Sequence, residues 1–327
     1  MENSKFRVII VGAGPVGLYL AHALSLASIP FIVLEQQSSI TNTGGQLIFT
    51  WPQTVRLLDQ IGLYTEVQEI GVEIYEKKRV FGGDGHVMTS TRFWQDMKDN
   101  HAYPFLLLPR GKLVQILYAN LPEKESRISR PLEICGQRTG KKAEPGGRNP
   151  ETLVMGRIVL VGDAAHKTTS VNGLGLTCGL HSAAALANEI TKIVVGDREV
   201  DTKAIENAFK RYQAEREGEA RQIWGDGYKI IRDVTSRRWS SRFWDEWVLP
   251  WIDIEKFWGG ALVSWLLIRH GQILGFVPFK GEEASGPESF GTVESATTIQ
   301  ASGHNGQKGL NYCPNTTLSN PKPHSVI

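Results

Sequence analysis

The chain has 327 residues, with 36 lysines and arginines against 34 aspartates and glutamates, for a formal net charge of +2. This length allows two ordinary domains with a sizeable core, and the balanced charge gives no reason to predict a nucleic-acid partner. The three cysteines lack CxxC spacing, which argues against a zinc site, a disulfide framework or a redox-active disulfide and indicates a reducing compartment.

The beginning of the chain carries the pattern of a nucleotide-binding βαβ unit. Residues 7–11 predict a strand, the glycine fingerprint GAGPVG follows at 12–17, and an apolar helix extends to about Ser28. The apolar run 31–34 predicts a second, buried parallel strand that ends at Glu35. Because the first strand begins within about six residues of the N-terminus, we expect no signal peptide and a cytoplasmic protein.

The residues of this unit have distinct predicted roles. Gly12 allows a tight turn, Gly14 lets the backbone approach a pyrophosphate, and Gly17 lets the helix pack closely on the sheet. Pro15 lies at the helix start, where its missing N–H costs no hydrogen bond, and the other N–H groups face the phosphates. Glu35 is placed to accept hydrogen bonds from ribose hydroxyls. A glycine-rich turn without a nucleotide is the alternative, but strand, helix, strand and acid together favour a nucleotide.

The next part of the chain predicts a loop, two helices and a hairpin. The polar loop 36–45 ends in Gly45, where the backbone can turn sharply or pass close to a flat ligand. Residues 54–61 and 112–121 predict helices, and the alternating pattern over 72–92 predicts a β-hairpin.

Arg110 precedes the second of these helices. A guanidinium at this position could pair with a phosphate or cap the edge of a flavin. Taken alone, Arg110 is more simply interpreted as a surface arginine without a ligand.

A second ligand-facing edge is predicted further along. Residues 157–161 predict another buried strand, which leads into the sequence GDAAH at 162–166 and then into a glycine-rich helix start. Asp163 could accept hydrogen bonds from ribityl hydroxyls, and the helix N-terminus near Gly175 could stabilise negative charge on a flavin. Alone, GDAAH fits a plain exit from strand to loop equally well, and His166 is interpreted as structural rather than as a base.

Three stretches have a distinctive composition. Residues 126–155 form a basic, glycine-rich linker with little to bury. Seven of the nine tryptophans fall between residues 224 and 265, which indicates aromatic packing or an interfacial surface. The uncharged run 257–268 is short of the roughly 18 residues that span a bilayer, so a buried hairpin or helix is favoured and peripheral membrane contact is the alternative. The tail 281–327 has a disordered composition.

Several features of the chain match one known site: the glycine fingerprint, Glu35, Arg110, and GDAAH with the later GLG at 173–175. Together they resemble the FAD site of FAD-dependent monooxygenases of the aromatic-hydroxylase type (group A). The closest similarity is to the fungal branch that epoxidises or hydroxylates prenylated and terpenoid metabolites. The resemblance covers about residues 7–121 and 156–225 and more loosely the Trp-rich region.

This resemblance implies an α/β fold, with a Rossmann-like FAD-binding parallel sheet, a reduced substrate domain and a helical, Trp-rich C-terminal region. The implied divisions are two parts of an FAD-binding domain, a linker that replaces most of the substrate domain, a Trp-rich helical region and a disordered tail. The FAD-binding parts are expected at 1–125 and 156–225, with the linker at 126–155 between them. The Trp-rich region is expected at 226–280 and the tail at 281–327.

The resemblance also implies the residues that hold the cofactor. Because the flavin carries the chemistry, no catalytic side chain needs to stand out in the sequence, and no metal is expected. Glu35 would bind the adenosine ribose, Asp163 the ribityl or pyrophosphate region, and the backbone at Gly175 and Leu176 the isoalloxazine. The full implied set is Gly12, Gly14, Pro15, Val16, Gly17, Glu35, Gly45, Arg110, Asp163, Gly173, Gly175 and Leu176. NAD(P)H would reduce the flavin, and O2 would supply one oxygen atom to a hydrophobic small-molecule substrate.

The chain departs from the family pattern in two ways. Relatives usually carry a long central segment, and here only the linker 126–155 occupies that place. Ser170 and Thr177 stand where the family usually has proline and asparagine. A non-oxygenating FAD-binding remnant therefore stays open as an alternative. An NAD-dependent dehydrogenase that uses only the first glycine fingerprint is another alternative.

Overall fold

The computed structural model describes residues 6–37, 46–80, 85–122, 126–129, 153–166, 168, 173–196, 200–235 and 271–278. All of them belong to one compact unit, Met1–Gly286. The predictions for Gly45, Ser170, most of the linker, the tryptophans beyond Trp224 and the tail lie outside the described residues.

The predicted βαβ unit is confirmed. Strand β1 (Val8–Val11), helix α1 (Pro15–Leu26) and strand β2 (Phe31–Leu34) follow one another, and the two strands pair in parallel from Val8 opposite Phe31. The inward residues of both strands are buried beneath α1, since Ile10, Phe31 and Val33 are almost inaccessible. This alternation between a buried and an outer face is what a strand with period two produces.

A third strand completes the sheet of the βαβ unit. Strand β8 (Ser126–Ser129) pairs in parallel with β2, so the sheet order is β1-β2-β8. This strand lies at the start of the range 126–155 that was predicted to be a linker. The polar sequence Ser-Arg-Ile-Ser gave no strand signal because sheet pairing uses backbone groups and an edge strand needs few apolar side chains.

The outer face of β1 is not covered by any of the described residues. Ile9 is 63% exposed and Val11 is 76% exposed. Register places Ile32 and Leu34, both half-buried, beside them on the same face. Parallel sheets normally have both faces covered, so this apolar face is incomplete within the part of the chain that the structure describes.

A second sheet is antiparallel and has the order β3-β7-β4. Its strands are β3 (Leu47–Thr50), β7 (Leu106–Pro109) and β4 (Val72–Glu73). Helices α3 (Tyr64–Ile70) and α5 (Arg110–Ala119) pack against β7, and α2 (Pro52–Gln60) packs against α3. The predicted helices over 54–61 and 112–121 are confirmed, and both begin two residues earlier.

The predicted hairpin over 72–92 is also confirmed, although β4 belongs to the neighbouring sheet. Strands β5 (Lys77–Val80) and β6 (Val87–Thr91) pair in antiparallel orientation, and α4 (Phe93–His101) follows.

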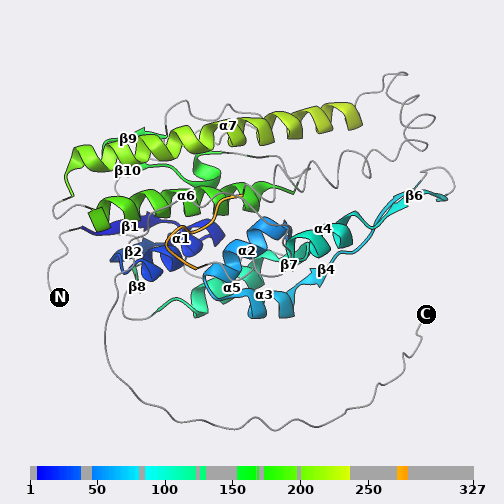
Figure 1. Ribbon diagram of the computed structural model, residues 1–327, viewed down its shortest axis with the longest axis horizontal. Coiled ribbons are helices and arrows are strands. Elements are labelled where there is room, and N and C mark those ends of the chain that lie inside the picture. The colour runs from blue at the N-terminus through cyan, green and yellow to red at the C-terminus, as the bar shows by residue number, and fades with distance from the viewer. Residues whose placement is uncertain are drawn as a thin grey trace, which may run out of the picture. The chain divides into compact units, whose positions relative to one another are not determined.

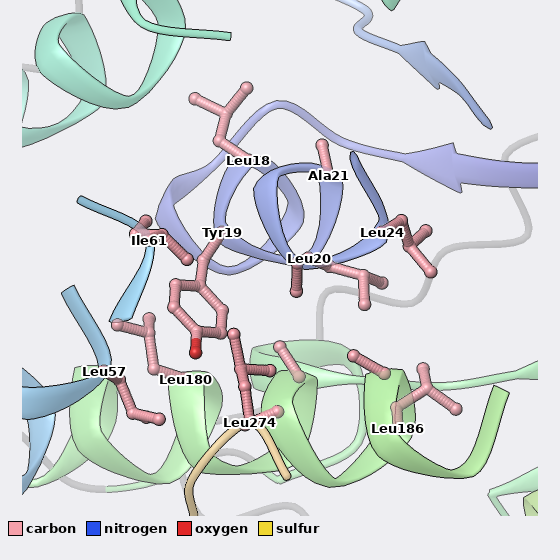
Figure 2. Close-up of a cluster of buried hydrophobic side chains, with 14 of the residues drawn as sticks. Leu18, Tyr19, Leu20, Ala21, Leu24, Leu57, Ile61, Leu180, Leu186 and Leu274 are labelled. Atoms are coloured by element: carbon pink, nitrogen blue, oxygen red, sulfur yellow. The ribbon is translucent and has the colours of Figure 1, made fainter. Parts of the chain in front are cut away.

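Two long helices complete the described core. Helix α6 (Gly175–Gly196) contacts α1 on one side and α7 (Thr202–Thr235) on the other, and Figure 1 shows it between them. Figure 2 shows Tyr19 and Leu20 of α1 pointing toward α6, near Leu180. Alanines at 183, 184, 185 and 187 of α6 are fully buried, and their small side chains allow the close approach of neighbouring helices.

Helix α7 crosses one of the predicted divisions of the chain. It continues to Thr235, so the predicted boundary between residues 225 and 226 lies inside a helix. Gly225 does not end it, because a glycine within a helix costs only about 1 kcal/mol and tertiary packing offsets that cost.

The strand predicted over 157–161 is mostly wrong. Only Ile158–Val159 is a strand (β10), and it pairs in antiparallel orientation with β9 (Val154–Met155). Ile158 is 58% exposed, so this strand is not the buried one that its apolar sequence predicted. An apolar run signals burial only when other elements cover it, and here Val159 packs against the core while Ile158 is left exposed.

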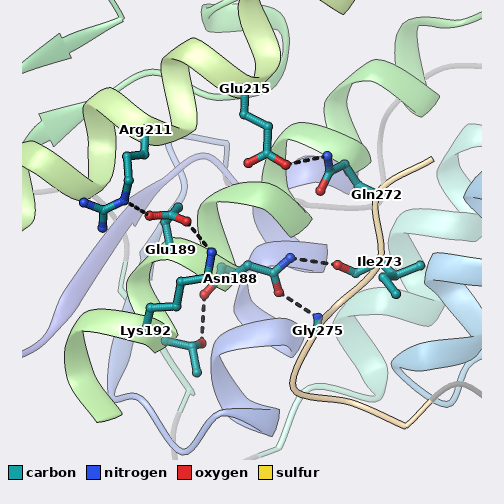
Figure 3. Close-up of polar contacts among 10 residues, drawn as sticks. Asn188, Glu189, Lys192, Arg211, Glu215, Gln272, Ile273 and Gly275 are labelled. Atoms are coloured by element: carbon teal, nitrogen blue, oxygen red, sulfur yellow. Dashed lines mark hydrogen bonds and ion pairs between the residues drawn. The ribbon is translucent and has the colours of Figure 1, made fainter. Parts of the chain in front are cut away.

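The side-chain carboxamides of two helix residues bind the backbone of the segment 271–278. Gln60 of α2 donates to the Leu274 carbonyl at 3.1 Å and accepts from the Leu274 N–H at 2.9 Å. Asn188 of α6 likewise donates to the Ile273 carbonyl at 2.8 Å and accepts from the Gly275 N–H at 2.9 Å (Figure 3). The backbone N–H and carbonyl groups of this segment are therefore paired with two side chains, where in a sheet they would be paired with a neighbouring strand.

None of the helices in the described ranges is both long and apolar enough to cross a membrane. The predicted peripheral contact through the Trp-rich region falls on residues beyond Trp224 that lie mostly outside those ranges, and it stays a prediction.

Candidate cofactor site

The first glycine turn joins β1 to α1. Gly12 has a φ of +107°, which favours glycine, and its N–H donates to the Leu34 carbonyl at 2.7 Å. A Cβ on Gly17 would lie 2.1 Å from the Gly12 carbonyl oxygen, so only glycine fits where helix and turn touch. A Cβ on Gly14 would meet no atom within 4 Å, so the backbone there faces open space on the side where a ligand could approach.

The N-terminus of α1 is free to receive an anion. Its N-cap is Gly14, Pro15 lies at the first helical position, and the first turn has neither a side-chain cap nor an acidic residue. The N–H groups at a helix start lack helical partners and carry the positive end of the helix dipole, and in α1 all of them except the missing one of Pro15 are present. This arrangement suits a phosphate or pyrophosphate.

Glu35 has a structural role that its sequence position did not reveal. One carboxylate oxygen accepts a hydrogen bond from the Ala13 N–H at 2.6 Å, and the other accepts from the Gln37 N–H at 2.8 Å. The side chain thus ties the end of β2 to the glycine turn. A carboxylate has lone pairs for further donors, so these bonds leave capacity for ribose hydroxyls.

The second glycine turn lies directly against the first turn of α1. Gly162 has a φ of +64° and begins a short 3-10 helix, η1 (Gly162–Ala164). A Cβ on Gly162 would approach Val16 of α1 within 3.1 Å, and a Cβ on Gly179 of α6 would approach the same valine within 2.5 Å. Val16 is therefore enclosed by two glycines from distant parts of the chain. Asp163 is exposed at this junction.

The start of α6 forms the third part of the site. Gly173 has a φ of +63°, and a Cβ there would meet the Phe49 ring at 3.0 Å. Gly175 begins the helix, and Leu176 is half-buried. Phe49, which is 44% exposed, was not among the predicted site residues. A single aromatic residue in a short apolar strand carries no signal of a ligand, so only the fold could place it here.

Thr177, which stands where the family usually has asparagine, is fixed by a neighbour. It is buried, and its hydroxyl oxygen accepts a hydrogen bond from the Thr54 hydroxyl of α2 at 2.8 Å. The first turn of α6 is thereby joined to α2.

Arg110 is brought to the edge of the second sheet. It begins α5 and is half-buried, and its backbone N–H donates to the Gln46 carbonyl at 2.9 Å. No described residue pairs with its guanidinium. The structure thus sets Arg110 beside the residue that follows Gly45, but its role toward a cofactor stays a prediction.

Near the second turn lies a polar cluster in which His166, His181 and Arg216 are buried and Glu219 is partly exposed. Arg216 is completely buried and ion-pairs with Glu219, while His181 Nδ1 lies 3.6 Å from Glu219 Oε1. Burial lowers the pKa of both His166 and His181, and the positive charge of Arg216 lowers them further. Both imidazoles are therefore kept neutral, and the buried His166 agrees with its predicted structural role.

Glu219 is the anionic member of this cluster. Burial by itself would raise the pKa of its carboxyl group, but His181 and the charge of Arg216 outweigh burial and lower the pKa to about 2. The carboxylate is thus ionised at every physiological pH and neutralises the buried guanidinium.

The comparisons with known proteins agree with this geometry. Residues 5–142 and 141–225 match the family described as FAD binding domain. The FAD-dependent monooxygenase srdH of Neurospora crassa is 36% identical over 433 residues, covering 84% of this chain and 97% of that relative. The chain belongs to this family of FAD-dependent monooxygenases. Its cofactor is FAD, and its Rossmann-like α/β class is as predicted.

Further similarities cover smaller parts or the fold alone. The monooxygenase is 31% identical over 175 residues to the FAD-dependent monooxygenase adrH of Penicillium rubens, a match that covers 52% of this chain and 37% of that relative. HpxO of Klebsiella pneumoniae, solved with FAD and uric acid, has a TM-score of 0.62 at 14% identity, covering 79% of this chain and 96% of that chain. PqsL of Pseudomonas aeruginosa has a TM-score of 0.55 at 16% identity, covering 73% and 99%.

The extent of the matches fits the expected absence of a central segment. The alignment with srdH spans 433 positions, more than the 327 residues of this monooxygenase, so that relative has sequence without a counterpart here. The family matches the chain in two pieces that meet at residues 141–142, inside the predicted linker.

The residues of the monooxygenase fit a dinucleotide at both glycine turns. Gly14 leaves room for a close approach, the start of α1 supplies unpaired N–H groups, and Asp163 is exposed beside Val16. The ADP half of FAD would lie along the first turn, and the second turn would meet its ribityl half.

Proposed function

We propose that this protein uses NAD(P)H and O2 to hydroxylate or epoxidise a hydrophobic small molecule, a secondary metabolite of terpenoid or meroterpenoid type. The observation that carries the proposal is the close approach of Val16 to Gly162, which brings the two glycine turns side by side. A dinucleotide that spans both turns can be held only if they are adjacent. The terpenoid class is supported by the resemblance to the fungal branch.

The proposed binding roles follow the position of each residue. The backbone from Gly12 to Gly17 would hold the pyrophosphate, Glu35 the adenosine ribose, and Asp163 the ribityl chain. Backbone groups at the start of α6, around Gly175 and Leu176, would face the isoalloxazine, with Gly45 and Arg110 as further contacts. Bound FAD would supply the redox chemistry, taking electrons from NAD(P)H and passing one oxygen atom of O2 to the substrate.

The apolar surface beside Gly173 supports a hydrophobic substrate. Phe49 contacts this glycine, and Leu47 lies on the same face of β3 two residues earlier. Register places Leu107 opposite Phe49 and Val72 opposite Leu107, so an apolar row crosses three strands. Leu47, Phe49 and Val72 are all exposed. The row would repel water from the reacting region, as oxygen transfer requires.

A second candidate function is a non-oxygenating FAD-binding remnant. It is favoured by the uncovered outer face of β1, where Ile9 and Val11 are exposed, together with the extra sequence of srdH. A substrate side that lacks a wall would admit water, so reduced flavin would yield hydrogen peroxide rather than product.

One purified preparation separates these functions. The protein is incubated with FAD and desalted, its absorption spectrum is recorded, and NADPH consumption is compared with peroxide formed and oxygen consumed. The proposal expects a flavin spectrum and, with terpenoid or prenylated aromatic test compounds, product formed in excess of peroxide. A flavin spectrum with peroxide equal to the NADPH consumed supports the remnant. Absence of a flavin spectrum after incubation contradicts both.

A further inference from the structure

Helix α7 fixes the segment that leads into the second glycine turn. The Tyr212 hydroxyl donates to the Leu160 carbonyl at 3.1 Å, and the Gln213 side chain accepts from the Leu153 N–H at 3.0 Å. Leu160 and Leu153 are themselves joined, since the Leu160 N–H donates to the Leu153 carbonyl at 2.9 Å. Both β9 and β10 have two residues and pair only with each other among the described strands. Side chains of α7, rather than a wide sheet, therefore locate this hairpin.

The position of Leu160 determines that of the cofactor turn. Leu160 lies two residues before Gly162, and Gly162 contacts Val16 at the start of α1. A shift of Leu160 away from α7 would thus move Gly162 and Asp163 relative to the first glycine turn.

The surroundings of Tyr212 make it a constant hydrogen-bond donor. The side chain is completely buried, and burial raises the pKa of its hydroxyl to about 12. Ser182 of α6 lies beside it and accepts from Arg216 Nε at 3.2 Å, one turn further along α7. The hydroxyl therefore stays protonated at neutral pH, and the groups around it are held by both long helices.

We infer that Tyr212 is a positioning residue for the cofactor site, whose hydroxyl holds Leu160 and thereby keeps Gly162 and Asp163 at the separation from α1 that FAD requires. The inference rests on the proposed function, because it assumes that FAD meets both turns. It assigns to α7, which contributes no predicted cofactor contact, control over cofactor affinity.

The test compares two buried tyrosines that differ in whether the hydroxyl has hydrogen-bond partners. Tyr212→Phe removes a hydroxyl that donates to Leu160, whereas Tyr19→Phe removes an equally buried hydroxyl that has no hydrogen-bond partner. For each full-length apoprotein, FAD affinity is measured by fluorescence titration and amide hydrogen exchange by mass spectrometry. We expect Tyr212→Phe to raise the Kd for FAD about fivefold, the effect of one net hydrogen bond. Exchange should accelerate in the peptide 158–166, and Tyr19→Phe should change neither quantity.

The outcomes are distinguishable. Equal Kd values for wild-type protein and Tyr212→Phe overturn the inference while the proposed function stands. Faster exchange spread over the whole molecule also overturns it, because that result indicates general destabilisation. A wild-type protein that binds no FAD removes the proposed function and the inference with it.

A second variant keeps the test decisive if Tyr212→Phe does not fold. Gln213→Ala releases the same hairpin at Leu153 and leaves the buried core intact. A rise of about twofold or more in the Kd for FAD supports the inference, and an unchanged Kd overturns it.

Discussion

At the scale of single residues, Glu35 stabilises the glycine turn in addition to its proposed role in binding a ligand. Both of its carboxylate oxygens are hydrogen-bonded to backbone N–H groups, at Ala13 and Gln37. The sequence indicated an acid at the end of β2, and from that position only a ligand role could be predicted. The structure adds that the same acid shapes the turn.

Glu35→Ala should therefore weaken the fold as well as FAD binding. Loss of a hydrogen bond to a charged acceptor is expected to lower the free energy of unfolding of the apoprotein by about 1 to 3 kcal/mol. Urea unfolding without FAD measures the change in the free energy of unfolding, and FAD titration measures the change in FAD affinity. An apoprotein as stable as wild type would show that the bond to Ala13 contributes nothing.

Gly14 and Gly17 allow ligand approach and chain packing to be tested separately. A Cβ at Gly17 would collide with the Gly12 carbonyl, whereas a Cβ at Gly14 meets open space. We expect Gly17→Ala to destabilise the apoprotein by about 2 to 3 kcal/mol. Gly14→Ala should cost about 1 kcal/mol or less and still lower FAD affinity, because its methyl group would stand where the pyrophosphate approaches.

Thermal unfolding of the two apoprotein variants measures their stability, and FAD titration measures their affinity for the cofactor. If Gly14→Ala binds FAD as tightly as wild type, the pyrophosphate does not approach the turn at that position.

At the scale of elements, an ion pair within α7, between Arg216 and Glu219, contacts α6 through His181 and Ser182 and contributes stability that depends on pH. The carboxyl of Glu219 has an ordinary pKa of 4.5 that falls to about 2 in the folded protein. A group whose pKa is depressed by folding stabilises the fold above its unfolded pKa, and this stability is lost as pH falls toward the folded pKa.

Glu219→Gln leaves the fully buried Arg216 without its anion, so we expect a loss of about 3 kcal/mol at neutral pH. The difference from wild type should persist down to a pH near 4.5 and shrink as pH approaches 2. Urea unfolding at several pH values measures it. Glu217→Gln is the matched control, because its ion pair with Arg221 is on the surface and should contribute less than about 1 kcal/mol. Equal losses for the two variants would contradict this account.

The segment 271–278 depends on side chains for its place in the fold. Gln60→Leu keeps the size of the side chain but removes both of its bonds with Leu274. We expect the free energy of unfolding to fall by about 2 to 3 kcal/mol, because buried backbone groups lose their partners. Amide exchange should rise at residues 272–276.

Gln68→Leu serves as the control for this change, since Gln68 is exposed on α3. A surface substitution of this kind should change stability by about 0.5 kcal/mol or less. Unchanged exchange at 272–276 in Gln60→Leu would show that other contacts hold the segment.

At the scale of the whole molecule, the described part leaves two apolar sheet faces uncovered. One is the outer face of β1 with Ile9 and Val11, and the other is the face of β3 with Leu47 and Phe49. The relative srdH has additional sequence, and the family match breaks at residues 141–142. Exposed apolar faces are costly in water, so their presence fits a chain that lacks some of the sequence of that relative.

The sequence by itself determined the cofactor class and most local elements. The βαβ unit, the helices after Pro52 and Arg110, and the hairpin of β5 with β6 all follow from short-range periodicity and glycine positions. Such patterns are local, so they can be read without knowing what lies nearby.

Only the tertiary structure decided which distant residues meet. It placed Val16 between Gly162 and Gly179, Phe49 against Gly173, and Tyr212 on the Leu160 carbonyl. It also showed that 157–161 is not a buried strand and that α7 continues to Thr235. Burial and long-range hydrogen bonds depend on neighbours that are far away along the chain, and no local pattern records them.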